Sequence, residues 1–160
     1  MIKQIDRYMN QLMRFLIGAC LAVMTILTLL AVFNRYVLNA PISWAEEVVR
    51  YLMIWMAMMG LGIAFRENRL VAIVMFQDLL PARPKKFVNQ LIWALILFFS
   101  VMAIILGIQL VHLARNDETA ALGISMIYPY LSVPVGFAFL ILQMVFMALE
   151  ARELQQAKPK

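Results

Sequence analysis

Long apolar stretches alternate with short polar segments along this chain. Residues 15–33 and 51–65 carry no formal charge. A helix needs roughly 20 apolar residues to cross a hydrocarbon core of about 30 Å, so stretches of this length predict transmembrane helices. We expect four spans, at about residues 15–33, 44–65, 87–113 and 130–149. The predicted fold is an all-α integral membrane protein in which residues 1–160 form a single membrane domain.

The polar segments predict how these helices begin and end. Apolar residues recur at helical spacing in residues 1–14, so this lead-in is expected to lie along the membrane surface before the first span. Pro41 should break the helix, and Ser43 followed by Glu46 has the spacing of a capping box. Residues 70–80 are apolar but too short to cross the bilayer, which predicts an interfacial or re-entrant helix.

Basic residues predict the orientation of the spans. The N-terminal segment, residues 66–86 and the C-terminal tail hold eleven of the 14 Lys and Arg residues. Four spans place these three segments on the same side of the membrane. Because basic segments near span ends resist translocation, that side should be the cytoplasm, and both termini are expected there.

Composition supports the membrane assignment and limits the function. Of all residues, 64% are hydrophobic and 14% are charged, against roughly 45–50% and 25% in soluble domains. The net charge of +5 comes from short clusters at span ends, so membrane lipid is an expected partner and nucleic acid is not. The middle of every predicted span lacks Asp, Glu, Lys and Arg, although a self-contained ion-coupled carrier usually has an ionisable or unwound site there.

Candidate chemistry is sparse in this sequence. Cys20 is the only cysteine and His112 the only histidine, so the chain has no thiol pair and no pair of histidine ligands for haem. The sequence has no HExxH motif and no serine and histidine pair in facing spans, so nothing in it indicates a hydrolase. The sequence therefore predicts no catalytic residues, no metal site and no cofactor, and the chain is not expected to be an enzyme.

The polar stretch between the first two spans holds the main candidate site. Glu46 and Arg50 are four residues apart, and Glu47 and Arg50 three apart, which favours ion pairs on one helix. Arg35 could join them from the preceding span, and Trp44 suits the headgroup region. Three interpretations remain open: an interfacial ion network that joins two helix ends, a surface that binds a partner, and a coupling-ion site.

Small residues recur at helical spacing in the second predicted span. Ala57, Gly60 and Ala64 follow this spacing, and Gly62 lies beside them. Small side chains let neighbouring helices approach closely in a membrane. One face of this span is therefore predicted to pack against protein.

The stretch RYVLNAPISWAEEVVR at residues 35–50 resembles the small membrane subunit of tripartite ATP-independent periplasmic (TRAP) transporters. GLGIAFR at residues 60–66 and YLSVPVGF at residues 130–137 also resemble the family pattern, and the resemblance covers about residues 10–145. One stretch departs from it. Where the family commonly has a histidine followed by Ile-x-Val-Asp, this chain reads LVAIV at residues 70–74.

The resemblance implies a three-part importer in the bacterial inner membrane. Its parts would be a periplasmic solute-binding protein, a large membrane subunit that carries the solute and coupling sodium, and this four-helix small subunit. The small subunit is implied to brace the large one and to help dock the binding protein, and the implied solutes are carboxylates. The alternative is a self-sufficient four-helix transporter that acts as a homodimer, although the first span lacks the acidic residue that such exporters usually carry.

Overall fold

The computed structural model describes residues 2–67 and 82–156, which fold mainly as helices. The elements are α1 (Ile2–Tyr36), α2 (Ser43–Arg66), α4 (Ala82–Leu113), the short 3₁₀ helix η1 (Ala114–Asn116) and α5 (Ile127–Gln156). Four helices are long and apolar enough to cross a membrane, in agreement with the four predicted spans. The predicted interfacial helix at residues 70–80 and the atypical stretch at residues 70–74 lie outside the described residues.

Two predicted helix starts differ from the structure. α1 is one continuous helix from Ile2, so the lead-in does not form a separate segment that turns into the span. The lead-in and the span share helical spacing, and no proline separates them. The predicted capping box at Ser43 is also wrong. The N-cap is Ile42, which makes no side-chain capping bond, and Ser43 is already the first helical residue. The Glu46 carboxylate, which the capping box would need, binds Arg35 instead.

The connection between α1 and α2 begins with a tight backbone turn. The Ala40 N–H donates a hydrogen bond to the Asn34 carbonyl at 3.1 Å, and Asn39 adopts a left-handed φ of 51°. Asparagine tolerates this conformation better than most residues do. Pro41 follows, and it cannot continue the helix. These residues reverse the chain within a short connection and bring α2 alongside α1.

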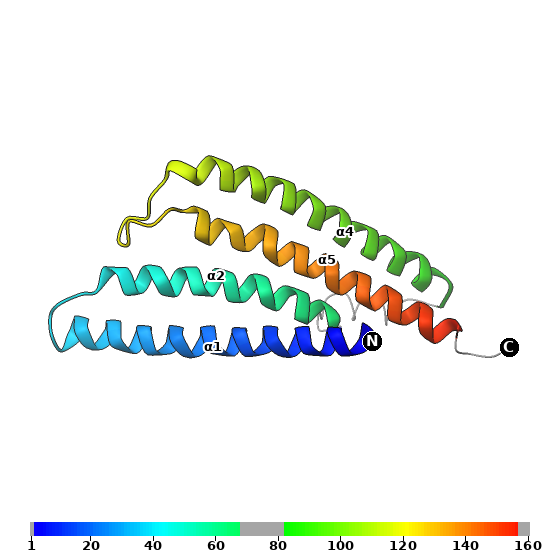
Figure 1. Ribbon diagram of the computed structural model, residues 1–160, viewed down its shortest axis with the longest axis horizontal. Helices are drawn as coiled ribbons and strands as arrows, with labels where there is room; N and C mark the ends of the chain where they lie inside the picture. Colours follow the sequence, from blue (N-terminus) through cyan, green and yellow to red (C-terminus); the bar gives the residue numbers. More distant parts are fainter. Residues whose placement is uncertain (1, 68–81, 157–160) are drawn as a thin grey trace.

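The four long helices form a single layer in the order α1, α2, α5, α4 (Figure 1). α2 packs against α1 and α5, α4 packs against α5, and α1 meets α5 only slightly. The two central helices, α2 and α5, run in the same direction, and the two outer helices run in the opposite one. The α1–α2 and α4–α5 connections therefore share one end of the layer, called here the loop end, and both chain termini share the other, called the terminal end.

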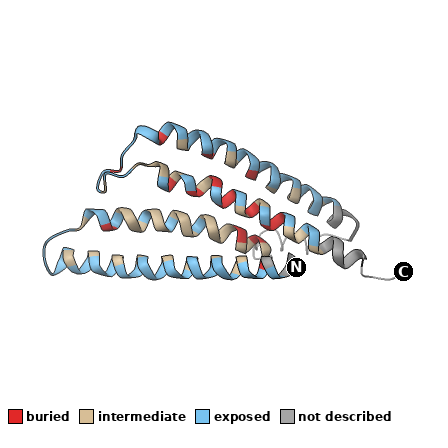
Figure 2. Cartoon of the chain, in the orientation of Figure 1, coloured by how far each residue is buried: buried red, intermediate tan, exposed pale blue. Residues whose placement is uncertain are grey.

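Burial within the chain is concentrated on α5 (Figure 2). In the most apolar window of each helix, 33% of residues are buried in α5, 11% in α2 and in α4, and 0% in α1. The small core combines Phe65 of α2 with Phe137, Leu140 and Met144 of α5. Trp93 of α4 meets the Phe65 ring edge-on, with ring centroids 5.5 Å apart. Many large apolar side chains on all four long helices stay exposed within the described residues.

Glycines allow the closest approaches between helices. A Cβ at Gly136 of α5 would lie 2.6 Å from the Met58 Cβ of α2 and 3.0 Å from the Met58 carbonyl oxygen. A Cβ at Gly107 of α4 would lie 3.0 Å from Cδ of Pro134, the proline inside α5. The absence of a side chain at these two glycines lets α5 pack directly against both of its neighbours.

The small residues predicted for close packing do not share one environment. Gly62 is buried, and a Cβ there would lie 2.4 Å from the Phe139 ring of α5. A Cβ at Gly60 would have no neighbour within 4 Å. Ala57 is exposed and Ala64 is half-buried. Within the described chain, α2 thus contacts α5 through Gly62 and leaves the surface at Ala57 and Gly60 open.

Candidate functional site

The first candidate contact joins two helix ends at the loop end of the layer. Arg35, in the last turn of α1, forms an ion pair with Glu46, in the first turn of α2. The two side chains are 52% and 50% exposed. Water and salt screen such a pair, so it orients the connection more than it stabilises the fold.

Glu47, the next residue, makes a different set of contacts. One carboxylate oxygen, Oε1, accepts a hydrogen bond from the Tyr51 hydroxyl one turn later in α2. The other, Oε2, accepts the backbone N–H groups of Ala121 and Leu122, each at 3.0 Å. Glu47 therefore joins α2 to the connection between α4 and α5.

That connection contains a compact turn, residues 117–126, called here the loop-end hairpin. The Thr119 N–H donates to the Ile124 carbonyl at 2.8 Å, and the Ile124 N–H donates to the Thr119 hydroxyl at 3.1 Å. Gly123 has a φ of 62°, a left-handed conformation that glycine adopts without steric cost. The hairpin is thus closed by its own hydrogen bonds and contacts α2 through its tip.

Within the described residues Arg50 forms no close ion pair with Glu46 or Glu47, although its charge still acts on Glu47. Arg50 is exposed, and none of the ion pairs found within residues 2–67 and 82–156 includes it. The physical reason is competition, because Arg35 holds one carboxylate and the hairpin amides hold the other. Of the predicted ion network, the structure brings Arg35 and Glu46 together and gives Glu47 another partner.

A groove separates the two connections at the loop end. It has a volume of about 740 Å³ and lies between Pro41 and Trp44 on one side and Ala120 and Ala121 on the other. Trp44 is 45% exposed. Trp44 is therefore one wall of an open, partly apolar groove.

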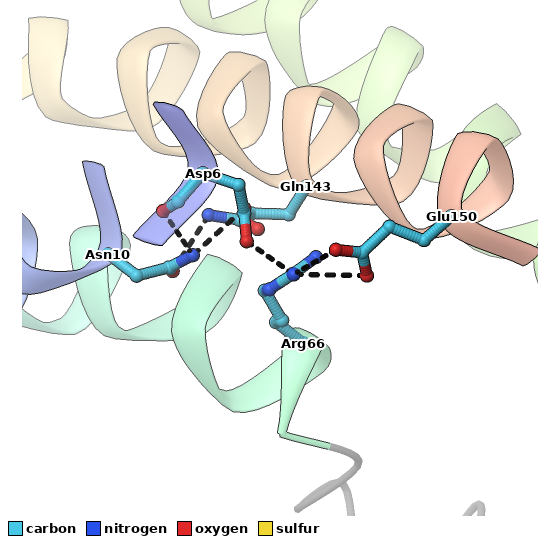
Figure 3. Close-up of polar contacts among 5 residues, drawn as sticks. All are labelled: Asp6, Asn10, Arg66, Gln143 and Glu150. Carbon is cyan, nitrogen blue, oxygen red and sulfur yellow. Dashed lines mark hydrogen bonds and ion pairs between the residues drawn. The ribbon is translucent and has the colours of Figure 1, made fainter. Parts of the chain in front are cut away.

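A second polar network, shown in Figure 3, lies at the terminal end and joins three helices. Arg66 of α2 forms an ion pair with Asp6 of α1, and its Nη2 donates to both carboxylate oxygens of Glu150 of α5, each at 3.2 Å. Asn10 donates to the Asp6 carboxylate at 2.9 Å, and Gln143 donates to the Asn10 side-chain oxygen at 2.9 Å. The Asp6 side chain is only 5% exposed, and Gln143 is fully buried. This network is more buried than the pair at the loop end.

Sequence reasoning missed this terminal-end network. One available signal was Gln143, the only amide side chain in the predicted last span. A polar side chain in an apolar helix usually faces a partner rather than lipid. Its partner depends on the order of the helices in the layer, which the residue pattern does not contain.

Both networks hold helices in place relative to one another. Their interactions are ion pairs and hydrogen bonds that join helices near the ends of the layer. In the described ranges 2–67 and 82–156, no three His, Cys, Asp or Glu side chains gather closely enough to bind a metal ion. The arrangement can hold helices in register and present a surface at the loop end.

Comparison with known proteins identifies the family. Residues 24–153 match the family described as tripartite ATP-independent periplasmic transporters, DctQ component. The sialic acid TRAP transporter small permease protein SiaQ of Vibrio cholerae is 34% identical over 128 residues, which cover 79% of this chain and 70% of SiaQ. A putative TRAP transporter small permease protein of Haemophilus influenzae is 38% identical over 81 residues. That match covers 51% of this chain and 50% of the relative, so it spans about half of each protein.

A longer relative shares the same region. The sialic acid TRAP transporter permease protein SiaT of Haemophilus influenzae is 26% identical over 129 residues, which cover 81% of this chain but 21% of SiaT. The match of residues 24–153 to the family confirms the resemblance seen in the sequence. The chain therefore belongs to the DctQ-component family of TRAP transporters, a family of membrane transport subunits and not of enzymes.

Proposed function

We propose that this chain is the small scaffold subunit of a TRAP-type importer in the bacterial inner membrane. In this proposal it braces a large membrane subunit and helps a periplasmic solute-binding protein to dock at the loop end. The complex takes up a carboxylate solute coupled to sodium. Arg35, Trp44, Glu46, Glu47 and Arg50 contribute to the outward surface.

The observation that carries this proposal is the single-layer arrangement of the helices. None of the most apolar window of α1 is buried, and all four long helices expose large apolar side chains. A layer one helix thick encloses no solute path of its own. Such a layer fits a wall against which a larger membrane protein packs, and the open surface at Ala57 and Gly60 is our candidate for close contact with that protein.

Two further observations support the same proposal. The middle of each span lacks acidic and basic side chains, whereas carriers usually place such groups near the bilayer midplane. The relative SiaT is much longer than this chain and contains a region similar to it, so a small-subunit segment and further permease sequence occur together in one protein. SiaQ and SiaT are both named for sialic acid, whose carboxylate agrees with the proposed solute class.

Uptake measurements test the scaffold proposal. Vesicles that contain this chain alone should show no uptake above protein-free vesicles, whereas vesicles with the chain, the large subunit and the binding protein should show sodium-dependent uptake. An affinity tag on this chain should also recover the large subunit from detergent extracts. Uptake by this chain alone would support the homodimer alternative and overturn the scaffold role.

Cysteine labelling tests the proposed orientation. In a Cys20→Ser background, Leu38→Cys at the loop end should react with a membrane-impermeant maleimide added to intact spheroplasts. Gln11→Cys near the terminal end should react only after the membrane is opened; both positions are exposed, so accessibility depends on the side of the membrane. The reverse labelling pattern would place the termini in the periplasm.

A further inference from the structure

We infer that Glu47 is a positioning residue that holds the loop-end hairpin in place against α2. Two consecutive backbone N–H groups, those of Ala121 and Leu122, converge on the same carboxylate oxygen. Consecutive amides that point to one side of a turn form a favourable site for an anion. Here the anion is a side chain of the same protein, and it comes from a residue far away in the sequence.

The contact reaches the tip of the hairpin, and the Tyr51 side chain of α2 adds a hydrogen bond to Thr119 nearer the base of the hairpin. The hydrogen bonds between Thr119 and Ile124 close the turn around Ala121 and Leu122 but do not fix it to any helix. The Trp55 indole N–H donates to the Tyr128 carbonyl at 3.2 Å, which restrains the start of α5 instead. The backbone amides of the tip itself, at Ala121 and Leu122, are tied to α2 through the Glu47 carboxylate.

Two neighbouring carboxylates on α2 thus hold opposite walls of one groove. Glu46 binds Arg35 and so restrains the end of α1. The connection that leaves this end contains Pro41 and forms one wall of the groove. Glu47 binds the amides of the hairpin, which contributes the other wall. Because Glu46 and Glu47 are neighbours on α2, this helix sets the distance between the two walls of the groove.

The consequence for docking rests on the proposed function. If the loop end receives the binding protein, a fixed hairpin lowers the entropy lost on association, because the surface is already ordered. Glu47 then affects the affinity for the binding protein without contacting it. The solute preference of the binding protein should stay unchanged.

Hydrogen exchange of the assembled complex in detergent tests this inference directly. Peptides that cover residues 117–126 should exchange about tenfold faster in Glu47→Ala than in the parent protein, since local opening governs exchange. Glu47→Gln should stay close to the parent, because its side-chain oxygen can accept both amides and its NH₂ can donate to Tyr51. Glu46→Ala is the matched control and should leave hairpin exchange unchanged.

The same variants separate the inference from the proposed function. Glu47→Asp keeps the charge but is one methylene shorter, so it should also accelerate hairpin exchange, and it serves as the test if Glu47→Ala is not recovered. Parent-like exchange in Glu47→Ala or Glu47→Asp overturns the inference. Faster exchange combined with several-fold weaker binding of the solute-binding protein, restored in Glu47→Gln, supports both claims. Faster exchange with unchanged binding supports the positioning role and contradicts docking at the loop end.

Discussion

Among the charged residues that the structure describes, Arg66→Ala should have the largest destabilising effect of any single charge removal. It leaves the buried Asp6 carboxylate and the Glu150 carboxylate without their shared cation, and the three side chains are only 20%, 5% and 26% exposed for Arg66, Asp6 and Glu150. Removing one partner of a fully buried ion pair costs about 3–5 kcal/mol, because the remaining charge stays buried without compensation. Water reaches the partly exposed Arg66 and Glu150, so we expect the lower end of this range. Detergent-mediated unfolding, followed by circular dichroism, should show this loss as an earlier transition.

Arg50→Ala is the matched control for this experiment. Arg50 lies on the same helix but is exposed and outside the ion pairs of the described residues, so the variant should unfold like the parent. Arg66→Lys should fall between the two, since it keeps the charge but cannot bridge both carboxylates with a planar guanidinium. If Arg66→Ala unfolds together with Arg50→Ala, the network does not stabilise the helix layer.

The second large effect is expected at Gly136, where α5 packs directly on the backbone of α2 at Met58. In Gly136→Ala the new methyl group would lie 2.6 Å from the Met58 Cβ and 3.0 Å from the Met58 carbonyl oxygen. Neither atom can rotate away, so the two central helices must separate. Overpacking of this kind costs about 1–3 kcal/mol, and the same unfolding assay should detect it.

The two glycines of α2, Gly60 and Gly62, give a graded comparison with Gly136 of α5. Gly60→Ala should be neutral or slightly stabilising, because no atom lies within 4 Å and alanine favours the helix. Gly62→Ala should have an intermediate effect, because its methyl group would meet the Phe139 ring, which can reorient. A destabilisation by Gly60→Ala equal to that of Gly136→Ala would contradict this packing.

Much of the helical framework could be predicted from the sequence. Charge-free stretches of sufficient length specify spans, and residues 44–65 and 87–113 differ little from α2 and from the apolar part of α4. Helix ends were harder to predict, because Ser43 has the spacing of a cap but local geometry makes it the first helical residue. A side chain that fits a capping motif can be outcompeted when another partner, here Arg35, binds the motif's glutamate.

The candidate site was predictable only in part. Sequence spacing describes neighbours on one helix, so it predicted ion pairs of Glu46 and Glu47 with Arg50, which are not among those of the described residues. It could not reveal that Glu47 binds Ala121 and Leu122, because that contact depends on the parallel packing of α2 and α5. The Arg66 network was missed for the same reason, since its partners lie on α1 and α5.

The position of α5 between α2 and α4 also has a consequence for biogenesis. α4 packs on α5, and α5 is synthesised after α4. Until α5 leaves the ribosome, α4 lacks the long helix of this chain against which it packs. α2 then has α1 as a neighbour but still lacks α5. Such a topology delays the most buried contacts until α5 has been synthesised. We therefore expect a nascent chain arrested before α5 to depend on lipid, insertion machinery or a partner protein to shield α4.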